Sequence, residues 1–260
     1  MEQQLYHLTL LLSGITCIVM AAALSYNNFY YRDYRIYKRS RLLTALTLTT
    51  FGIGFLLHLY FGWRTCWPSA ATALSVTYFH IGGTMLSWSH TSLLNPEYLN
   101  RFRVIRDMTA LVVNIVTLWT DVFFDISFLT GIGIGIFLTH VTWMSSDFLR
   151  TYLRVSRLVR QLPITKENAH WWTIGAQHST FYGQRSMSIS CYLIILFGLG
   201  SIIMTALLPH AVWPYSVLLC VGNAVFCYIY YSLDKYGAII EAATNATEDI
   251  HPKTQPKTGR

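Results

Sequence analysis

Charged side chains are scarce in this chain of 260 residues. Only 12% of the residues are Asp, Glu, Lys or Arg, whereas 53% are hydrophobic; a soluble domain carries about twice that charged fraction. The charges are also clustered, which leaves long uncharged stretches at 3–31, 42–63, 65–96, 108–120, 126–146 and 186–233. This pattern excludes soluble globular, disordered and nucleic-acid-binding proteins and predicts a membrane protein.

Motifs typical of enzymes and cofactor proteins are missing as well. No GxSxG, HExxH or glycine-rich phosphate-binding loop occurs, which disfavours the commonest hydrolase mechanisms. We expect no retinal, because the last apolar stretch has no lysine for a Schiff base and Lys235 follows it. We expect neither a metal nor an outer disulfide, because the cysteines have no CxxC or Cys/His spacing and Cys66 alone falls on a predicted outer loop.

The uncharged stretches predict an all-α integral membrane protein with seven transmembrane helices. Because about 20 apolar residues cross about 30 Å of hydrocarbon, we expect spans at 6–26, 42–62, 70–94, 108–125, 126–146, 188–208 and 214–233. Residues 1–245 would then form one helix bundle. Residues 246–260 are polar and contain Pro252 and Pro256, so we expect a disordered tail.

The basic residues predict how the bundle is oriented. Lysines and arginines gather in segments 32–41, 101–106, 150–185 and 235–260, whereas Arg64 alone falls on the other side. Since basic loops are retained in the cytoplasm, we expect the N-terminus outside and the C-terminus inside. Contact with anionic lipids of the inner leaflet accounts for the net charge of +7 without a nucleic-acid partner.

Residues 146–162 continue the fifth predicted span as an amphipathic helix. Apolar side chains recur there at helical spacing, opposite a basic face made by Arg150, Arg154, Arg157 and Arg160. Such a helix lies on anionic headgroups, or it docks a cytoplasmic signalling protein or a second subunit. The same span contains Gly131 and Gly135, whose spacing permits close helix packing inside the bundle or in a homodimer.

Polar side chains follow four of the predicted spans at helical periodicity. Because polar groups are costly in hydrocarbon, they usually face the bundle interior or water. The expected helix directions place one set in the outer half, where it can line an outward-facing cavity for a proton or a small molecule: His58, Arg64, His80, Asp121, Asp125, His210 and Asn223. The alternative is that Asp121 and Asp125 only reach the outer headgroups and that His58 makes a structural hydrogen bond.

Two further histidines lie deeper toward the inner side. His90 and His140 fall at comparable depth on the third and fifth predicted spans, as a bis-histidine haem would require. Their Ser- and Thr-rich surroundings suit hydrogen-bonded packing equally well. An intramembrane enzyme or haem protein that uses His80, His90 and His140 is therefore one alternative function, although we expect no catalytic residue and no cofactor.

Four segments carry a resemblance to a known class of protein: 32–41, 79–84, 146–162 and 230–236. Across residues 1–245 the chain resembles the multi-span sensor halves of bacterial membrane-bound regulators, including AraC-type transcription factors and histidine kinases. The resemblance implies a sensor in a bacterial inner membrane. No helix-turn-helix or kinase domain follows residue 245, so such a sensor would signal through a separate protein or be the sensor half of a longer regulator.

The sequence therefore favours a sensor or receptor-like module. It would bind a small molecule or a proton in the outward-facing cavity and signal through its basic cytoplasmic face. A transporter or channel that uses the same polar side chains as a path is the second interpretation.

Overall fold

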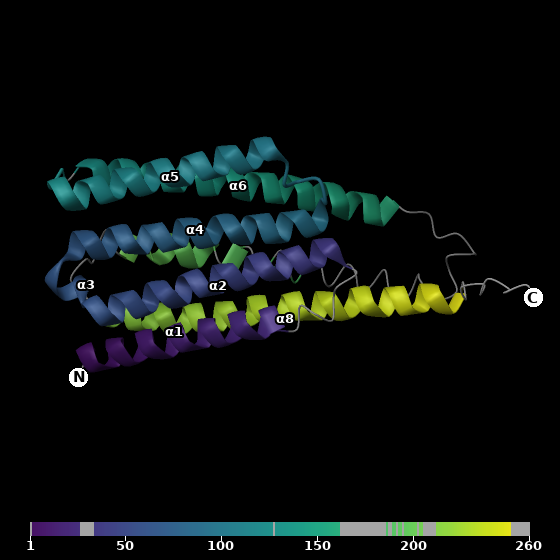
Figure 1. Ribbon diagram of the computed structural model, residues 1–260, viewed down its shortest axis with the longest axis horizontal. Coiled ribbons are helices and arrows are strands. Elements are labelled where there is room, and N and C mark those ends of the chain that lie inside the picture. The colour runs from purple at the N-terminus through teal and green to yellow at the C-terminus, as the bar shows by residue number, and fades with distance from the viewer. Residues whose placement is uncertain are drawn as a thin grey trace, which may run out of the picture.

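The computed structural model describes residues 2–26, 34–126, 128–161 and 212–250, together with 186, 189–190, 192–193, 195–201 and 203–204. The elements in these residues are all helices: α1 (Glu2–Tyr26), α2 (Arg35–Phe61), α3 (Trp63–Cys66), α4 (Pro68–Leu94), α5 (Arg101–Phe124), α6 (Phe128–Gln161) and α8 (Trp213–Ile250). The long helices lie side by side, with the start of α1 and the short α3 at one end and the last turns of α8 at the other (Figure 1).

Five of these helices are long and apolar enough to cross a bilayer: Glu2–Tyr26, Arg35–Phe61, Arg101–Phe124, Phe128–Arg154 and Trp213–Gly237. Their outward faces carry large apolar side chains; Leu8 and Val19 of α1, for example, are 52% and 59% exposed. Such a surface is unfavourable in water and favourable in hydrocarbon. The chain is therefore an integral membrane protein.

Helix α4 lies in the middle of the molecule. It contacts α2 on one side and both α5 and α6 on the other, while α1 packs against α2 and α8. It is 27 residues long and contains several serines, threonines and histidines. Although the sequence predicted a span at 70–94, α4 is not among the five helices that are apolar enough to cross a bilayer. Most of these polar side chains are buried against neighbouring helices, so α4 brings polar groups to the centre of the protein.

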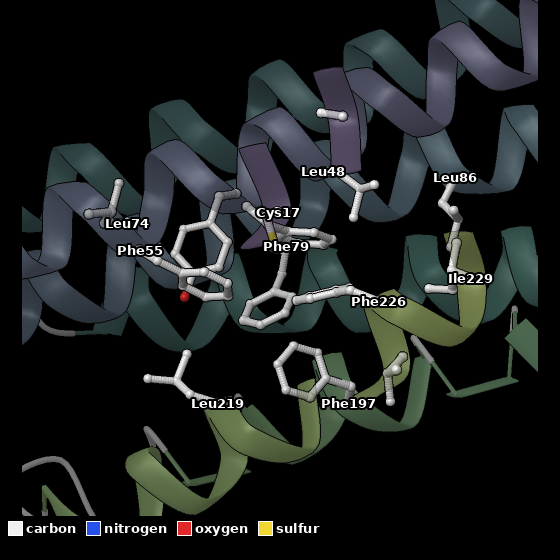
Figure 2. Packing of buried hydrophobic residues seen from close by; sticks show 14 of the residues in the cluster. Cys17, Leu48, Phe55, Leu74, Phe79, Leu86, Phe197, Leu219, Phe226 and Ile229 are labelled. Atoms are coloured by element: carbon white, nitrogen blue, oxygen red, sulfur yellow. The ribbon is translucent and has the colours of Figure 1, made fainter. Parts of the chain in front are cut away.

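Aromatic rings join α2, α4 and α8. Phe51 stacks on Phe226 with 5.0 Å between ring centroids, and Phe197 lies 5.4 Å from both Phe79 and Phe226. Figure 2 shows Phe79, Phe197 and Phe226 converging in this core. A Cβ atom at Gly82 would lie 2.7 Å from Phe51, so α4 approaches α2 this closely only because residue 82 has no side chain.

The helices agree with most of the predicted spans. Helix α6 runs without interruption to Gln161, so the segment predicted to continue the span over 146–162 is helical as far as it is described. Helix α8 extends to Ile250, past residue 245, where the sequence predicted that order ends, and residues 251–260 lie outside the described residues. The predicted span 188–208 is described only in part and is helical where it is described. The count of seven spans therefore stays a prediction.

Candidate functional site

The residues predicted to line one outward-facing cavity lie on different sides of α4. His58 and Arg64 meet near α3, but His80 faces α5 and α6. On α5, Asp121 accepts a hydrogen bond from Thr130 of α6. The prediction of a single cavity is wrong for these residues, because α5 and α6 pack on the side of α4 away from α2.

The other predicted cavity residues are also placed apart. Asp125 is exposed and ends α5 in a left-handed conformation, with φ of 54°. Asn223 of α8 donates from Nδ2 to Ser13 Oγ of α1 at 3.0 Å, which joins these two helices. His210 lies outside the described residues. Asp125 therefore ends a helix, and Asn223 joins two helices.

The first buried polar group is the arginine cluster, made of Tyr6, His58, Arg64, Ser75 and Tyr215. Arg64 donates from Nε to the Tyr6 hydroxyl and from Nη2 to Ser75 Oγ, both at 3.3 Å. Its guanidinium carbon lies 3.5 Å from the centroid of the Tyr215 ring. His58 Nε2 lies 3.0 Å from Ser75 Oγ. Arg64 is 4% exposed and His58 2%, so the cluster is closed off by packing.

A small cavity of about 20 Å³ lies beside this cluster. All of the cluster residues except Ser75 line it, together with Tyr78, Ser201 and apolar side chains. Two buried polar atoms of the lining have no hydrogen-bond partner among the described residues, namely His58 Nδ1 and the Tyr215 hydroxyl. Buried polar atoms are rarely left without a partner. The cavity therefore has polar groups available for an occupant.

The second buried polar group is a chain of hydrogen bonds across α4, α5 and α6. Asn114 Nδ2 lies 2.7 Å from His80 Nδ1, and His80 Nε2 lies 2.7 Å from His140 Nδ1. His140 Nε2 then lies 3.2 Å from Asp107 Oδ1. His80, Asp107 and Asn114 are fully buried, and His140 is 8% exposed. Three helices are therefore joined by one continuous series of polar contacts.

The chain continues from Asp107 toward the basic end of the bundle. Asp107 accepts hydrogen bonds at 2.8 Å from Trp88 Nε1 and from Arg106 Nε. Arg106 also lies between two carboxylates, with Nη2 2.7 Å from Asp107 and Nη1 3.9 Å from Asp147. We call the series from Asn114 through His80, His140, Asp107 and Arg106 to Asp147 the histidine relay. Its last member belongs to the amphipathic part of α6.

The hydrogen-bond directions in the relay follow from the donors. The Asn114 amide nitrogen can only donate, so His80 Nδ1 accepts and the ring proton is on Nε2. His80 then donates to His140 Nδ1, and His140 donates from Nε2 to Asp107. Both rings are neutral in this arrangement. With one arginine between two carboxylates, the relay carries a formal charge of −1.

Tyr98, in the connection between α4 and α5, lies near the Asp147 end of the relay. It is 1% exposed, and burial raises the pKa of its phenol, to which Asp147 and Asp107 add. Arg103 lies over the ring, 4.4 Å from its centroid. The phenol is therefore neutral at physiological pH and contributes no charge to the relay.

The proposed haem pair is not formed in this structure, because His140 pairs with His80 and not with His90. His90 is buried on α4, where Nδ1 lies 3.1 Å from the carbonyl of Leu86 one turn earlier and Nε2 has no partner. Axial ligation by His140 would require one of its two hydrogen bonds to break, because one ring nitrogen would have to bind the iron. Among the described residues, no group of three or more His, Cys, Asp or Glu side chains is placed to hold a metal ion.

Sequence reasoning missed the partners of His80 and His140. The sequence placed Arg106 in the basic inner segment and Trp88 at the inner membrane interface, and it indicated no role for Asp107. The spacing contained a signal, because Asp107 and Asn114 are seven residues apart, as are His140 and Asp147. Residues seven apart share one face of a helix.

Comparisons of the chain with known families, with curated proteins and with solved structures found no match.

Proposed function

We propose that the protein is a membrane sensor that takes up a proton or a small molecule among its buried polar side chains and signals through its basic cytoplasmic face. The observation that carries this proposal is the histidine relay. It connects a fully buried histidine of α4 with Asp147 of α6, and α6 then continues as the basic helix to Gln161.

In this proposal the chain crosses a bacterial inner membrane seven times, with its N-terminus outside. The arrangement of the described helices supports this orientation (Figure 1). The first turns of α2 and α5 and the end of α6 share one end of the molecule and carry several arginine or lysine residues each, whereas the later turns of α8, at the same end, carry Lys235 as their single basic residue. Arg64 lies in α3, at the opposite end. The basic end would face the cytoplasm and its anionic lipids.

The relay can accept one proton and keep a hydrogen bond at each of its members. A second proton on His80 would reside at Nδ1, where it meets the Asn114 amide. Asn114 Oδ1 has no partner in the present orientation, so rotation of the amide would turn this oxygen toward the new N–H group. The added charge of +1 would also neutralise the formal charge of −1 on the relay. Asn114 would thus change orientation with the protonation state of His80.

The same change would reach the cytoplasmic side through Arg106. A positive His80 ring, which is joined to Asp107 through His140, would weaken the attraction between Asp107 and Arg106, since two cations would then act on one carboxylate. Arg106 would be freer to pair with Asp147, which is now 3.9 Å away. Because Asp147 lies at the start of the amphipathic part of α6, this shift would alter how the basic helix sits on the membrane or on a partner protein.

A fluorescent noncanonical residue in place of the exposed Arg154 would test this proposal. The full-length protein is placed in lipid nanodiscs, and the emission is recorded from about pH 8 to about pH 5, the range in which histidine changes its charge. We expect the emission to change as the pH falls and this change to be absent in the double variant His80→Gln, His140→Gln. His7→Gln on α1 is the control, because it removes a histidine outside the relay.

Two results would contradict the sensor. The first is an emission that stays constant over the whole pH range in the wild-type protein. The second is a pH response in the double variant that equals that of the wild type, provided that both unfold at similar temperatures. A response that is lost in His7→Gln as well would point to a general effect of histidine removal and would also count against the relay.

Proton transport is the second candidate, because chains of His and Asp side chains within a bilayer also form proton relays. In the part of the chain that the structure describes, the hydrogen bonds run from Asn114 to Arg106, and an ion pair then reaches Asp147. These contacts do not connect with the arginine cluster, which favours sensing over transport. Proton flux into liposomes that contain the purified protein would favour transport, if His140→Gln abolished it.

A further inference from the structure

Arg64 is a buried cation that is surrounded by neutral groups. Its described partners are two hydroxyl groups and the face of an aromatic ring. Among the described residues it forms no ion pair with a carboxylate. A buried charge without a counter-charge is strongly unfavourable, whether inside a protein or within a membrane. Neutral hydrogen bonds and a cation–π contact offset only part of this cost.

The cavity beside Arg64 offers room for a counter-ion. Its volume of about 20 Å³ exceeds the roughly 10–15 Å³ that one water-sized occupant needs. It is too small for an extended organic ligand. Leucine and phenylalanine side chains form part of the lining, and the buried surroundings strengthen electrostatic attraction inside the cavity because the local dielectric is low.

Two more donors belong to the same lining. If Ser75 donates to His58 Nε2, the His58 ring proton is on Nδ1, which has no partner. The Tyr215 hydroxyl also has none, although its ring lies against Arg64. A guanidinium, an imidazole N–H and a phenolic O–H together form a donor set without an acceptor that carries charge. This is the chemistry that binds an anion.

We infer that the arginine cluster binds one small monovalent anion, of the size of chloride or formate, between Arg64, His58 and Tyr215. The anion neutralises Arg64 and accepts hydrogen bonds from the two donors that lack partners. A role of this site as an input to the sensor depends on the proposed function. Anion binding at the site does not depend on it. Size and charge both restrict the ligand, because the cavity is small and Arg64 supplies a single positive charge.

Thermal unfolding of the purified full-length protein in different sodium salts tests the inference. Chloride and formate are titrated against gluconate at constant ionic strength, because gluconate has the same charge and is too large for the cavity. An anion that binds the folded state raises the unfolding temperature in a saturable manner. We expect this rise with chloride and formate and none with gluconate.

Three variants locate the effect. Arg64→Gln removes the charge, and we expect it to abolish the anion-dependent rise. Tyr215→Phe keeps the ring over Arg64 and removes only the hydroxyl, so the anion-free protein should keep its unfolding temperature while the anion binds about tenfold or more weakly. Arg103→Gln removes an arginine that stacks on a tyrosine at the other end of the bundle, and its response should equal that of the wild type.

The possible results distinguish a failure of the anion site from a failure of the proposed sensor. The inference would be overturned if gluconate raised the unfolding temperature as much as chloride does. It would also be overturned if Tyr215→Phe bound the anion as tightly as the wild type, and this second test applies even if Arg64→Gln does not fold. Chloride binding that leaves the fluorescence at position 154 unchanged would uphold the anion site and count against it as an input to the sensor. A pH response of that fluorescence without any anion binding would uphold the sensor and overturn the anion site.

Discussion

Individual side chains in this protein are distributed as hydrocarbon requires. Asp107, His80 and Asn114 are fully buried, whereas Val112 and Val116 of α5 are 52% and 59% exposed. Lipid solvates the valines but cannot hydrogen-bond the polar groups. The polar residues must therefore satisfy one another, and the resulting network has few alternative partners. Substitution of one member should consequently affect the others.

Asp107→Asn tests how strongly the relay stabilises the fold. The asparagine amide would present N–H donors to Arg106, Trp88 and His140, all of which now donate to the carboxylate. We expect a loss of about 2–3 kcal/mol of unfolding free energy, less than for a fully buried ion pair, because Arg106 is 26% exposed. Chemical or thermal unfolding in detergent micelles measures this loss.

The matched control is Asp125→Asn, the same substitution at an exposed position. Asp125 occupies the left-handed conformation at the end of α5, which asparagine also tolerates well. We expect it to leave the unfolding free energy nearly unchanged. Equal effects of the two substitutions would mean that the relay makes no specific contribution to stability.

At the scale of whole helices, α5 and α6 pack through a different glycine from those that the spacing indicated. Gly131 and Gly135 form the four-residue spacing, but an added Cβ at either would meet no atom within 4 Å. Gly133, between them, faces α5, where a Cβ would lie 2.5 Å from Leu118. Within the glycine run 131–135, the close contact with α5 is therefore made by the middle glycine, Gly133.

Gly133→Ala should accordingly separate α6 from α5. The added methyl group overlaps Leu118 in a packed contact, which typically costs about 1–3 kcal/mol. Gly135→Ala, on the open face of the same helix, should leave stability unchanged or raise it slightly, because alanine favours the helix over glycine. Thermal unfolding of both variants in one detergent makes the comparison. A larger loss for Gly135→Ala would contradict this packing.

At the scale of the whole molecule, the ends of the helices decide how the protein faces the two sides of the membrane. Cys66 is exposed at the end of α3, opposite the end at which the basic turns gather (Figure 1). Cys17 is buried, and Cys220 and Cys227 lie within α8 among apolar residues. Cys191 lies outside the described residues, within the predicted span 188–208. A reagent that dissolves only in water therefore has a specific target at the α3 end.

A membrane-impermeant maleimide should label Cys66 in spheroplasts of the expression host, because the proposed orientation places α3 outside. Cys66→Ser should abolish this labelling and serves as the control. Labelling of Cys66 only after the membrane is permeabilised would show that the protein has the opposite orientation. The basic end would then face outward, against the distribution expected for basic loops.

The sequence by itself determined where the chain is apolar enough to cross a membrane, where its basic residues gather, and that α6 continues as an amphipathic helix. These properties depend on residues close together in the chain, so composition and periodicity suffice. Periodicity also determined that His80 and His140 lie on polar faces of their helices. It could not determine which helix each face meets.

Only the tertiary structure decided the neighbours. It paired His140 with His80 and not with His90, and it placed His58 and Arg64 together while it separated both from Asp121. The physical reason is that helix order and rotation depend on packing between helices distant in sequence. Here α4 lies between α2 and the pair α5 and α6, and this position divides the polar side chains into the arginine cluster and the histidine relay.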